Sequence, residues 1–388
     1  MKSAAGRENW GRVGPSGGVP EPRERRAGKS GAGSGVEQSV ALARPVPLSI
    51  LELSPIPAGG TAGVALRNSI DLARHADAWG YRRIWVAEHH NMPGIASVVP
   101  AILIGHLAEA TSRIRVGSGG VMLPNHAPLA IAEQFGMLES LHPGRIDLGI
   151  GRAPGTDRLT ASALRRSAEA GADDFPQQFA ELRAFFEDSF PDGHPYQQVH
   201  AAVAKGANPA IWLLGSSGYS AQVAGILGLP FSFAHHFSSE NTVPALELYR
   251  KCFEPSEVLE EPYAMVGVAV VVADTEAEAR FQHGSSRLSM LRLRTGRPGQ
   301  LPSPQEAAEY QPTPREKLVI GSATGSHVVG DPGQVAAGLD ELLERTGADE
   351  LIVTTTMYRH EDRLHSFELL AELADLKAGL SEATTAGP

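Results

Sequence analysis

The chain has 388 residues, of which 42% are hydrophobic and 20% charged, the composition of a globular protein with a substantial core. Its formal net charge of −10 argues against a nucleic-acid groove and against an anionic membrane surface as partners. The single cysteine, Cys252, excludes an intrachain disulfide and a cysteine metal cluster, and it fits a cytoplasmic location. The longest apolar run, Val266 to Ala273, is too short to span a bilayer.

Both ends of the chain differ in composition from its middle. Residues 1–44 are crowded with Gly, Pro, Ser and Arg and lack hydrophobic periodicity. Arg25 and Arg26 are not followed by the apolar segment that an export signal needs. Such segments bury too little apolar surface to offset the entropy of ordering. We therefore expect a disordered N-terminal extension over 1–44, one folded domain over 45–378 and a disordered tail over 379–388.

From Pro47 onward, short apolar runs alternate with amphipathic helical segments at intervals of roughly 30 residues. This alternation predicts the α/β class and a single (β/α)8 TIM barrel, with an open doubly wound sheet as the alternative. The predicted strands begin at Leu48, Arg83, Ile114, Arg145, Ala210, Phe231, Met265 and Glu350, and helices are predicted over Asn68–Trp79, Ala96–Thr111, Leu129–Leu141, Ala221–Leu227 and Pro332–Arg345.

Two long stretches interrupt the alternation, one after the fourth strand and one after the seventh. Ala153 to Asn208 contains a helical segment around Asp174–Phe190, and Phe281 to Val328 is rich in Arg, Pro, Gly and Ser. Both are expected to lie over the barrel mouth as insertions. The second is our candidate lid, and its alternative is an exposed mobile loop. The lid hypothesis rests on Arg287, Arg292, Arg294 and Arg297.

The second predicted strand ends in Glu88, His89 and His90, where a barrel places its chemistry. The structural alternative is that the histidines cap the next helix or fill polar gaps. Metal binding with His126 is disfavoured, because adjacent histidines on a strand point to opposite faces and no H-x-H follows the first strand. We therefore predict no metal.

The third to fifth predicted strands end in residues suited to a flat ligand that carries a phosphate. Gly119 and Gly120 lack Cβ atoms, which permits close approach to the backbone. Arg152 supplies a guanidinium at the end of the fourth strand. The run from Gly215 to Tyr219 opens a helix, whose free N–H groups and dipole attract an anion. The turn Gly330-Asp331-Pro332-Gly333 is interpreted instead as a helix cap.

Long stretches of this sequence resemble the luciferase-like flavin monooxygenases, most of all their "group 1" alkanal-monooxygenase-like branch. The resemblance extends from Pro45 to about Leu376. The stretches that carry it are SPIPAG, WVAEHHNMPGIAS, SRIRVGSGGVMLPNHAPL, AEQFGMLESLHPGRIDLGIGRAPGTD and LLGSSGYSAQVAGILGLPFSFAHHF.

The resemblance implies a barrel that binds reduced FMN with its ring at the strand ends. It implies that His89 is catalytic, titrating near neutral pH as a base, with Glu88 and His90 supporting it, and that Gly119-Gly120 forms a cis peptide beneath the flavin. Gly151 replaces a reactive cysteine of luciferase, so light emission does not follow. Tyr219 replaces a threonine. The expected cofactor-binding residues are Ser54, Gly119, Gly120, Asn125, Arg152, Gly215, Ser216, Ser217, Gly218 and Tyr219.

The expected function is that of an FMN-dependent monooxygenase that uses O2 to oxidise a small organic substrate, aldehyde-like or apolar. A separate flavin reductase is expected to supply reduced FMN, because no G-x-G-x-x-G fingerprint follows the first strand. The alternatives are a flavin- or deazaflavin-dependent hydride-transfer enzyme and a non-catalytic flavin-binding protein. Possible apolar lining residues are Leu53, Met122, Trp212 and Met265, and a homo-oligomer would pair through Ala96–Glu109 and Leu129–Leu141.

Overall fold

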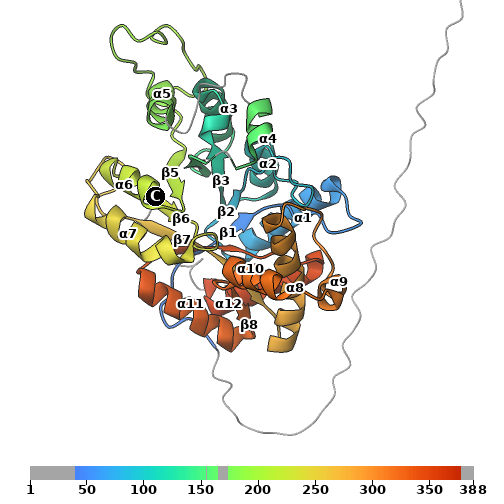
Figure 1. Cartoon of the computed structure of the whole chain (residues 1–388). Coiled ribbons are helices and arrows are strands. Elements are labelled where there is room, and N and C mark those ends of the chain that lie inside the picture. Colours follow the sequence, from blue (N-terminus) through green and yellow to red (C-terminus); the bar gives the residue numbers. More distant parts are fainter. Residues whose placement is uncertain (1–39, 154, 165–173, 377–388) are drawn as a thin grey trace, which may run out of the picture. The chain divides into compact units, whose positions relative to one another are not determined.

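Parallel strands close into a barrel with the helices outside it (Figure 1). The computed structural model describes residues 40–153, 155–164 and 174–376. Among these residues, eight strands form the barrel in the order β6-β5-β4-β3-β2-β1-β9-β7, and pairing of β6 with β7 closes it. The short strand β8 pairs in parallel with the carboxyl end of β7. The strands are β1 Leu48–Glu52, β2 Arg83–Val86, β3 Arg115–Met122, β4 Ile146–Gly151, β5 Ala210–Gly215, β6 Phe231–Phe233, β7 Ala264–Val272, β8 Val328–Gly330 and β9 Glu350–Thr354. The predicted TIM barrel is confirmed.

The helices begin and end at residues suited to these positions. Thr61 caps α1 through its side chain, and Gly80 ends α1 in the left-handed conformation, with φ 94°. Asp331 caps α11 in a capping box with Gln334, as the sequence predicts for that turn. The helices are α1 Ala62–Trp79, α2 Pro100–Ala110, α3 Pro128–Leu141, α4 Arg158–Leu164, α5 Phe175–Glu187, α6 Gly218–Ile226, α7 Thr242–Lys251, α8 Glu276–Arg294, α9 Pro304–Glu309, α10 Pro314–Thr324, α11 Pro332–Thr346 and α12 His360–Leu373, with 3-10 turns η1 Leu123–Asn125 and η3 Ser239–Asn241.

Side chains alternate between the barrel interior and the surrounding helices along each strand. On β2, Ile84 and Val86 belong to the large apolar cluster that includes the helices. Trp85 belongs to an inner cluster with Trp212, Met265 and Ile352. This inner cluster fills the middle of the barrel, so the barrel is a packed core rather than a pore.

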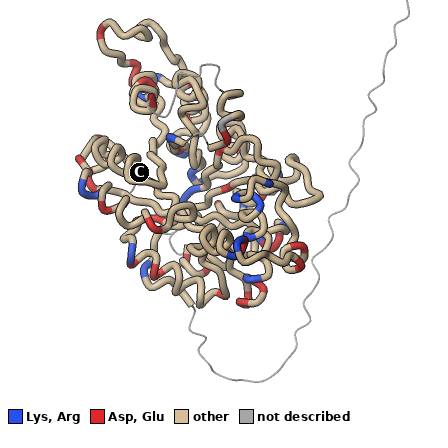
Figure 2. The backbone as a smooth tube through the Cα atoms, in the orientation of Figure 1, with Lys and Arg blue, Asp and Glu red and all other residues tan. Residues whose placement is uncertain are grey.

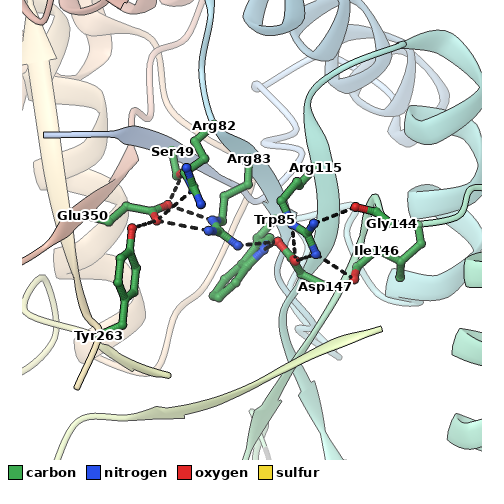
Figure 3. Close-up of polar contacts among 10 residues, drawn as sticks. All are labelled: Ser49, Arg82, Arg83, Trp85, Arg115, Gly144, Ile146, Asp147, Tyr263 and Glu350. Atoms are coloured by element: carbon green, nitrogen blue, oxygen red, sulfur yellow. Dashed lines mark hydrogen bonds and ion pairs between the residues drawn. The ribbon is translucent and has the colours of Figure 1, made fainter. Parts of the chain in front are cut away.

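The amino-terminal end of the barrel is closed by a buried ion network (Figure 3). Arg83 is fully buried and donates to Glu350 at 2.8 Å and to Asp147 at 2.8 Å. Asp147 also accepts hydrogen bonds from Arg115 and from the Trp85 indole, each at 2.8 Å. Burial alone raises the pKa of Asp147, but Arg83 and Arg115 outweigh burial and lower it. Ser49 and Tyr263 complete the network by donating to Glu350.

The stretch after the seventh strand differs from the expected loop. Helix α8 occupies its first part and α9 and α10 follow, with Leu288, Leu291 and Ile320 forming a small apolar core between α8 and α10. The alternative to the lid hypothesis, an exposed mobile loop, is therefore wrong for most of this segment. The stretch after β4 is an insertion that contains α4 and α5.

The folded part begins slightly before the expected boundary. Leu42 is buried, and its amide donates to the Leu373 carbonyl at 2.9 Å. Ala43 donates to the carboxylate of Asp340. The rest of the expected N-terminal extension, residues 1–39, and the expected tail, 379–388, lie outside the described residues.

Charges are interspersed by sign along the described chain (Figure 2). Among the described residues, no helix combines the length and apolar character needed to cross a membrane.

Arg83→Ala is expected to reduce the free energy of unfolding by about 3–5 kcal/mol, because two buried carboxylates would lose their shared cation. Urea unfolding measures the effect. The matched control is Arg183→Ala, since Arg183 pairs with Glu187 on the surface and each side chain is about half exposed. The control is expected to change stability by less than about 1 kcal/mol. Equal effects of the two substitutions would contradict the role of the network.

Candidate active site at the barrel mouth

A cavity of about 140 Å³ opens at the carboxyl ends of the strands. An adjoining hollow of about 190 Å³ shares part of its lining. Among the described residues that line the first cavity there is no Asp, Glu, Lys or Arg. Its titratable lining groups are the imidazoles of His89, His236 and His327. Catalytic sites of barrels lie at this end of the strands.

His89 continues the inward alternation of β2, after Arg83, Trp85 and Ala87, and lines both hollows. Its Nδ1 is buried and has no hydrogen-bond partner among the described residues. Burial lowers the pKa of His89, and nearby His90 lowers it further, whereas Glu88 raises it. These effects together hold the pKa of His89 below the ordinary value of an imidazole, and its role as a base stays a prediction.

Glu88 points away from the barrel interior and joins the ends of β2 and β3. The fully buried carboxylate accepts hydrogen bonds from His90 at 3.0 Å, from His126 at 2.9 Å and from the Met122 amide at 3.0 Å. Burial on its own raises the pKa of Glu88, but these three donors outweigh it and lower the pKa. Glu88 therefore stabilises the loop on either side of His89 without a hydrogen bond to His89 in the described structure. No group of three or more metal-ligating side chains occurs among the described residues.

The glycines of β3 are required by their close neighbours. The Gly119-Gly120 peptide bond is cis, as the resemblance implies. A Cβ on Gly119 would lie 2.7 Å from Leu51 Cδ1, and a Cβ on Gly120 would lie 2.7 Å from the carbonyl oxygen of Gly149. The barrel itself therefore needs glycine here, in addition to any need of a ligand. Gly119 also lines the cavity.

Arg152 contacts the start of α6, which follows the cavity-lining residue Leu214 by a few residues. The guanidinium of Arg152 stacks on the ring of Tyr219, 4.1 Å from its centroid. Ser217 is the N-cap of α6, but its side chain makes no capping hydrogen bond. The structure places the sequence-predicted residues at the end of β5 and the amino-terminal end of α6, with the guanidinium of Arg152 against one of them; they are Gly215, Ser216, Ser217, Gly218 and Tyr219.

Two more of the predicted cofactor-binding residues, Ser54 and Asn125, are buried and line neither hollow. Ser54 has φ 51° and is fully buried, and its hydroxyl lies 2.7 Å from that of Ser69. The structure therefore does not bring the Ser54 hydroxyl to the cavity. Asn125 ends the short η1 helix after β3 and is nearly buried.

The apolar lining also differs in part from the prediction. Leu53 lines both hollows. Trp212 and Met265 belong instead to the packed interior beneath the cavity. Met122 lies against Gly151 and Gly155, where a Cβ would meet its side chain.

Helix α8 closes one side of the cavity with a face of small and apolar side chains. Ser286 and Met290 line both hollows, and Leu293, one turn further, lines the outer one. The arginines of the lid hypothesis are not part of this lining. Arg292 pairs with Glu306 at 2.5 Å, and Arg297 lies 3.9 Å from Glu316. The segment therefore covers the mouth through its apolar face, while these arginines join it to α9 and α10.

Sequence reasoning assigned no role to His236 and His327. His236 follows β6, and its Nδ1 lies 2.9 Å from the Gly267 carbonyl oxygen. His327 precedes β8, and its Nδ1 lies 3.0 Å from Nε2 of His283 on α8. The run Ala234-His235-His236-Phe237 after a predicted strand was the available signal for His236. For His327 the sequence carries no comparable signal.

Acidification is expected to destabilise the fold through these imidazoles. Burial lowers the pKa to about 4 for His236, about 3 for His283 and about 4 for His327. Below pH 6.5 the unfolded chain binds protons that the folded chain does not, so stability falls as pH falls toward these values. Each group contributes a slope of about 1.4 kcal/mol per pH unit.

Urea unfolding at pH 7, 6 and 5 measures this slope. The double variant His283→Gln/His327→Gln is expected to flatten it. A free energy of unfolding that stays constant from pH 7 to 5 would contradict the assignment.

Comparisons with known proteins agree with this geometry. The family described as luciferase-like monooxygenase matches residues 46–350. The chain is 54% identical over 326 residues to the uncharacterised protein YvbT of Bacillus subtilis (strain 168), covering 84% of this chain and 96% of that one. It is 47% identical over 330 residues to a protein of Escherichia coli (strain K12) named luciferase-like monooxygenase, covering 85% and 97%.

A relative with a named substrate and a solved structure are also similar. The N-acetyl-S-alkylcysteine monooxygenase of Bacillus subtilis (strain 168) is 36% identical over 331 residues, covering 84% of this chain and 97% of that one. The crystal structure of apo-MsnO8 superposes with a TM-score of 0.77 at 38% identity, covering 86% of this chain and 98% of that one. This chain is a member of the luciferase-like monooxygenase family and an oxidoreductase by that membership.

Proposed function

We propose that this protein is a monooxygenase that uses reduced FMN and O2 to oxidise an uncharged organic substrate. The observation that carries the proposal is the pairing of an anion site with an uncharged cavity. Arg152 and the start of α6 suit a phosphate. The cavity beside them is lined by Gly119, His89 and apolar side chains, which suits a flat ring and an apolar substrate.

The residues present fit FMN by their chemistry. Arg152, Ser216 and Ser217 would hold the phosphate, and the backbone around Gly119 would support the ring. Reduced FMN supplies the electrons that activate O2. The chain's part is to orient the bound molecules, to exclude water with the apolar face of α8, and to place the imidazole of His89, whose pKa is lowered by burial, in the cavity as a hydrogen-bond or proton acceptor.

The substrate class follows from the lining of the cavity. Without a described Asp, Glu, Lys or Arg in that lining, a charged substrate would lose its hydration without a compensating partner. An aldehyde-like or other apolar molecule fits better. We further propose that a separate flavin reductase supplies the reduced FMN, and that the protein acts in the cytoplasm.

Two substitutions are expected to separate cofactor binding from turnover. Arg152→Gln removes the cation of the phosphate site, so FMN should bind at least 10-fold more weakly while the affinity for riboflavin, which lacks the phosphate, is unaffected.

His89→Ala should keep FMN affinity but lose about 10²–10⁴-fold in turnover. Fluorescence titration measures binding, and the rate at which product forms from decanal or 1-octanol with reduced FMN and O2 measures turnover.

The wild type distinguishes the alternatives in the same assays. FMN binding together with oxidation or reduction of the substrate in the absence of O2 would indicate hydride transfer. FMN binding with no acceleration over free reduced flavin would indicate a flavin-binding protein. Undiminished turnover of His89→Ala would refute the role of His89.

We also propose a homo-oligomer that pairs through α2 and α3. Ile102 on α2 and Leu141 on α3 are each 66% exposed, and Met137 is 54% exposed. Large apolar side chains clustered on an exposed surface favour association. Light scattering after gel filtration is expected to give the mass of a dimer or larger. Ile102→Glu/Leu141→Glu should shift it to the monomer, and a monomeric wild type would contradict the proposal.

A further inference from the structure

A second imidazole of the cavity, His236, is held more firmly than His89. It follows β6 and is one of the residues that line the cavity. Its backbone amide donates to the Gly267 carbonyl oxygen at 3.0 Å, and its Nδ1 lies 2.9 Å from the same oxygen. One carbonyl on β7 therefore fixes both the backbone and the ring of this residue.

This contact also fixes the position of the proton on the ring. A carbonyl oxygen only accepts hydrogen bonds, so Nδ1 must carry the hydrogen. In the neutral ring, Nε2 is then an unprotonated acceptor. A Cβ on Gly267 would lie 3.0 Å from both Cε1 and Nδ1 of His236. The absence of a side chain at 267 leaves the room in which the ring rests against β7.

The surroundings keep the ring neutral at pH 7. The titratable groups that face it are His89 at the end of β2, His327 before β8 and the neighbouring His235. Burial lowers the pKa of His236 to about 4, with His235 and His89 acting in the same direction and the bond to Gly267 opposing them. The described lining holds no charged carboxylate, Lys or Arg.

For His89 and His327, the described contacts do not determine which ring nitrogen carries the hydrogen. The Nδ1 of His89 has no partner among the described residues, so no hydrogen bond fixes its orientation. The Nδ1 of His327 faces Nε2 of His283, and either nitrogen can be the donor. Only for His236, among the three, does the geometry determine which nitrogen accepts.

We propose that Nε2 of His236 is the fixed hydrogen-bond acceptor for the substrate. This narrows the proposed class to uncharged, mostly apolar molecules that bear an O–H or N–H donor, such as alcohols, and excludes simple aldehydes. This proposal rests on the proposed function, because the bound molecule is a substrate only if the protein is an enzyme of that kind. Its test depends on binding alone, so its outcome is independent of whether the protein activates O2. The carbonyl of Gly267 is the positioning group.

The test compares two probes with the same alkyl tail, 1-octanol and methyl octyl ether, of which only the alcohol donates a hydrogen bond. Binding to the full chain is measured by calorimetry at pH 7, with and without oxidised FMN. The wild type is expected to prefer the alcohol by roughly 10-fold, the value of one net hydrogen bond. Equal affinities for the two probes would overturn the proposal.

His236→Asn is the decisive variant. The Asn side-chain N–H can still donate to the Gly267 carbonyl, but no atom remains at the position of Nε2. The preference for the alcohol should disappear while the affinity for the ether stays unchanged. His235→Asn is the matched control, because His235 lies next in the chain but contacts Thr242 at 2.8 Å. A preference retained in His236→Asn, or lost equally in the control, would contradict the proposal.

Two further measurements do not depend on a variant. Long-range ¹H–¹⁵N spectra of histidine-labelled protein should show His236 with its hydrogen on Nδ1 at pH 7. An assigned signal with the hydrogen on Nε2 would overturn the proposal. The alcohol preference should fall as pH falls toward 4, because the protonated Nε2 no longer accepts. A preference that persists below that pH would also contradict it.

Discussion

A guanidinium buried between two carboxylates is the constraint on which this structure depends. Arg83 contacts Glu350 of β9 and Asp147 of β4, so it ties β2 to strands on both sides of the barrel. A buried charge is stable only when its partners lie in position, and this fixes the register of β2. Because side chains on a strand alternate, a fixed Arg83 at the closed end also determines that His89 faces the cavity and Glu88 faces outward.

The two ends of the barrel interior differ in charge. The closed end holds a dense set of paired charges, and the described lining of the mouth holds three imidazoles with lowered pKa and no fixed charge. The trapped charges at the closed end serve rigidity. The uncharged mouth leaves Arg152, outside the cavity lining, as the cation beside it. Charge is thus concentrated where it orders strands and where an anion would be anchored, and is absent where the chemistry is proposed.

The sequence predicted the features that depend on local pattern. Strand alternation and the cap at Asp331 appear in the structure, since each depends on residues near in sequence. The cis bond between Gly119 and Gly120, which the resemblance implied, is also present, although the neighbours that require glycine there come from other strands. The sequence did not predict His236 or His327 as lining, because only closure of the barrel brings β6, β7 and the segment before β8 around one space. The stretch after β7 was expected to be a lid or an exposed loop, with no helix predicted in it. Instead α8 has a Thr275 cap and a face that lines the cavity. The roles of the site residues themselves stay predictions.

The absence of fixed charge in the described cavity lining has a consequence for thermodynamic linkage. An anion that enters the cavity finds no cation there, and the groups able to respond are the imidazoles. A nearby negative charge raises the pKa of an imidazole, so entry of an anion would draw protons from the solvent. Affinity for any anionic form of a bound molecule would then increase as pH falls, and a change in the ligand's charge would be accompanied by uptake or release of protons. Through these imidazole rings, the protein would take up or release protons whenever the charge of the molecule bound in the cavity changes.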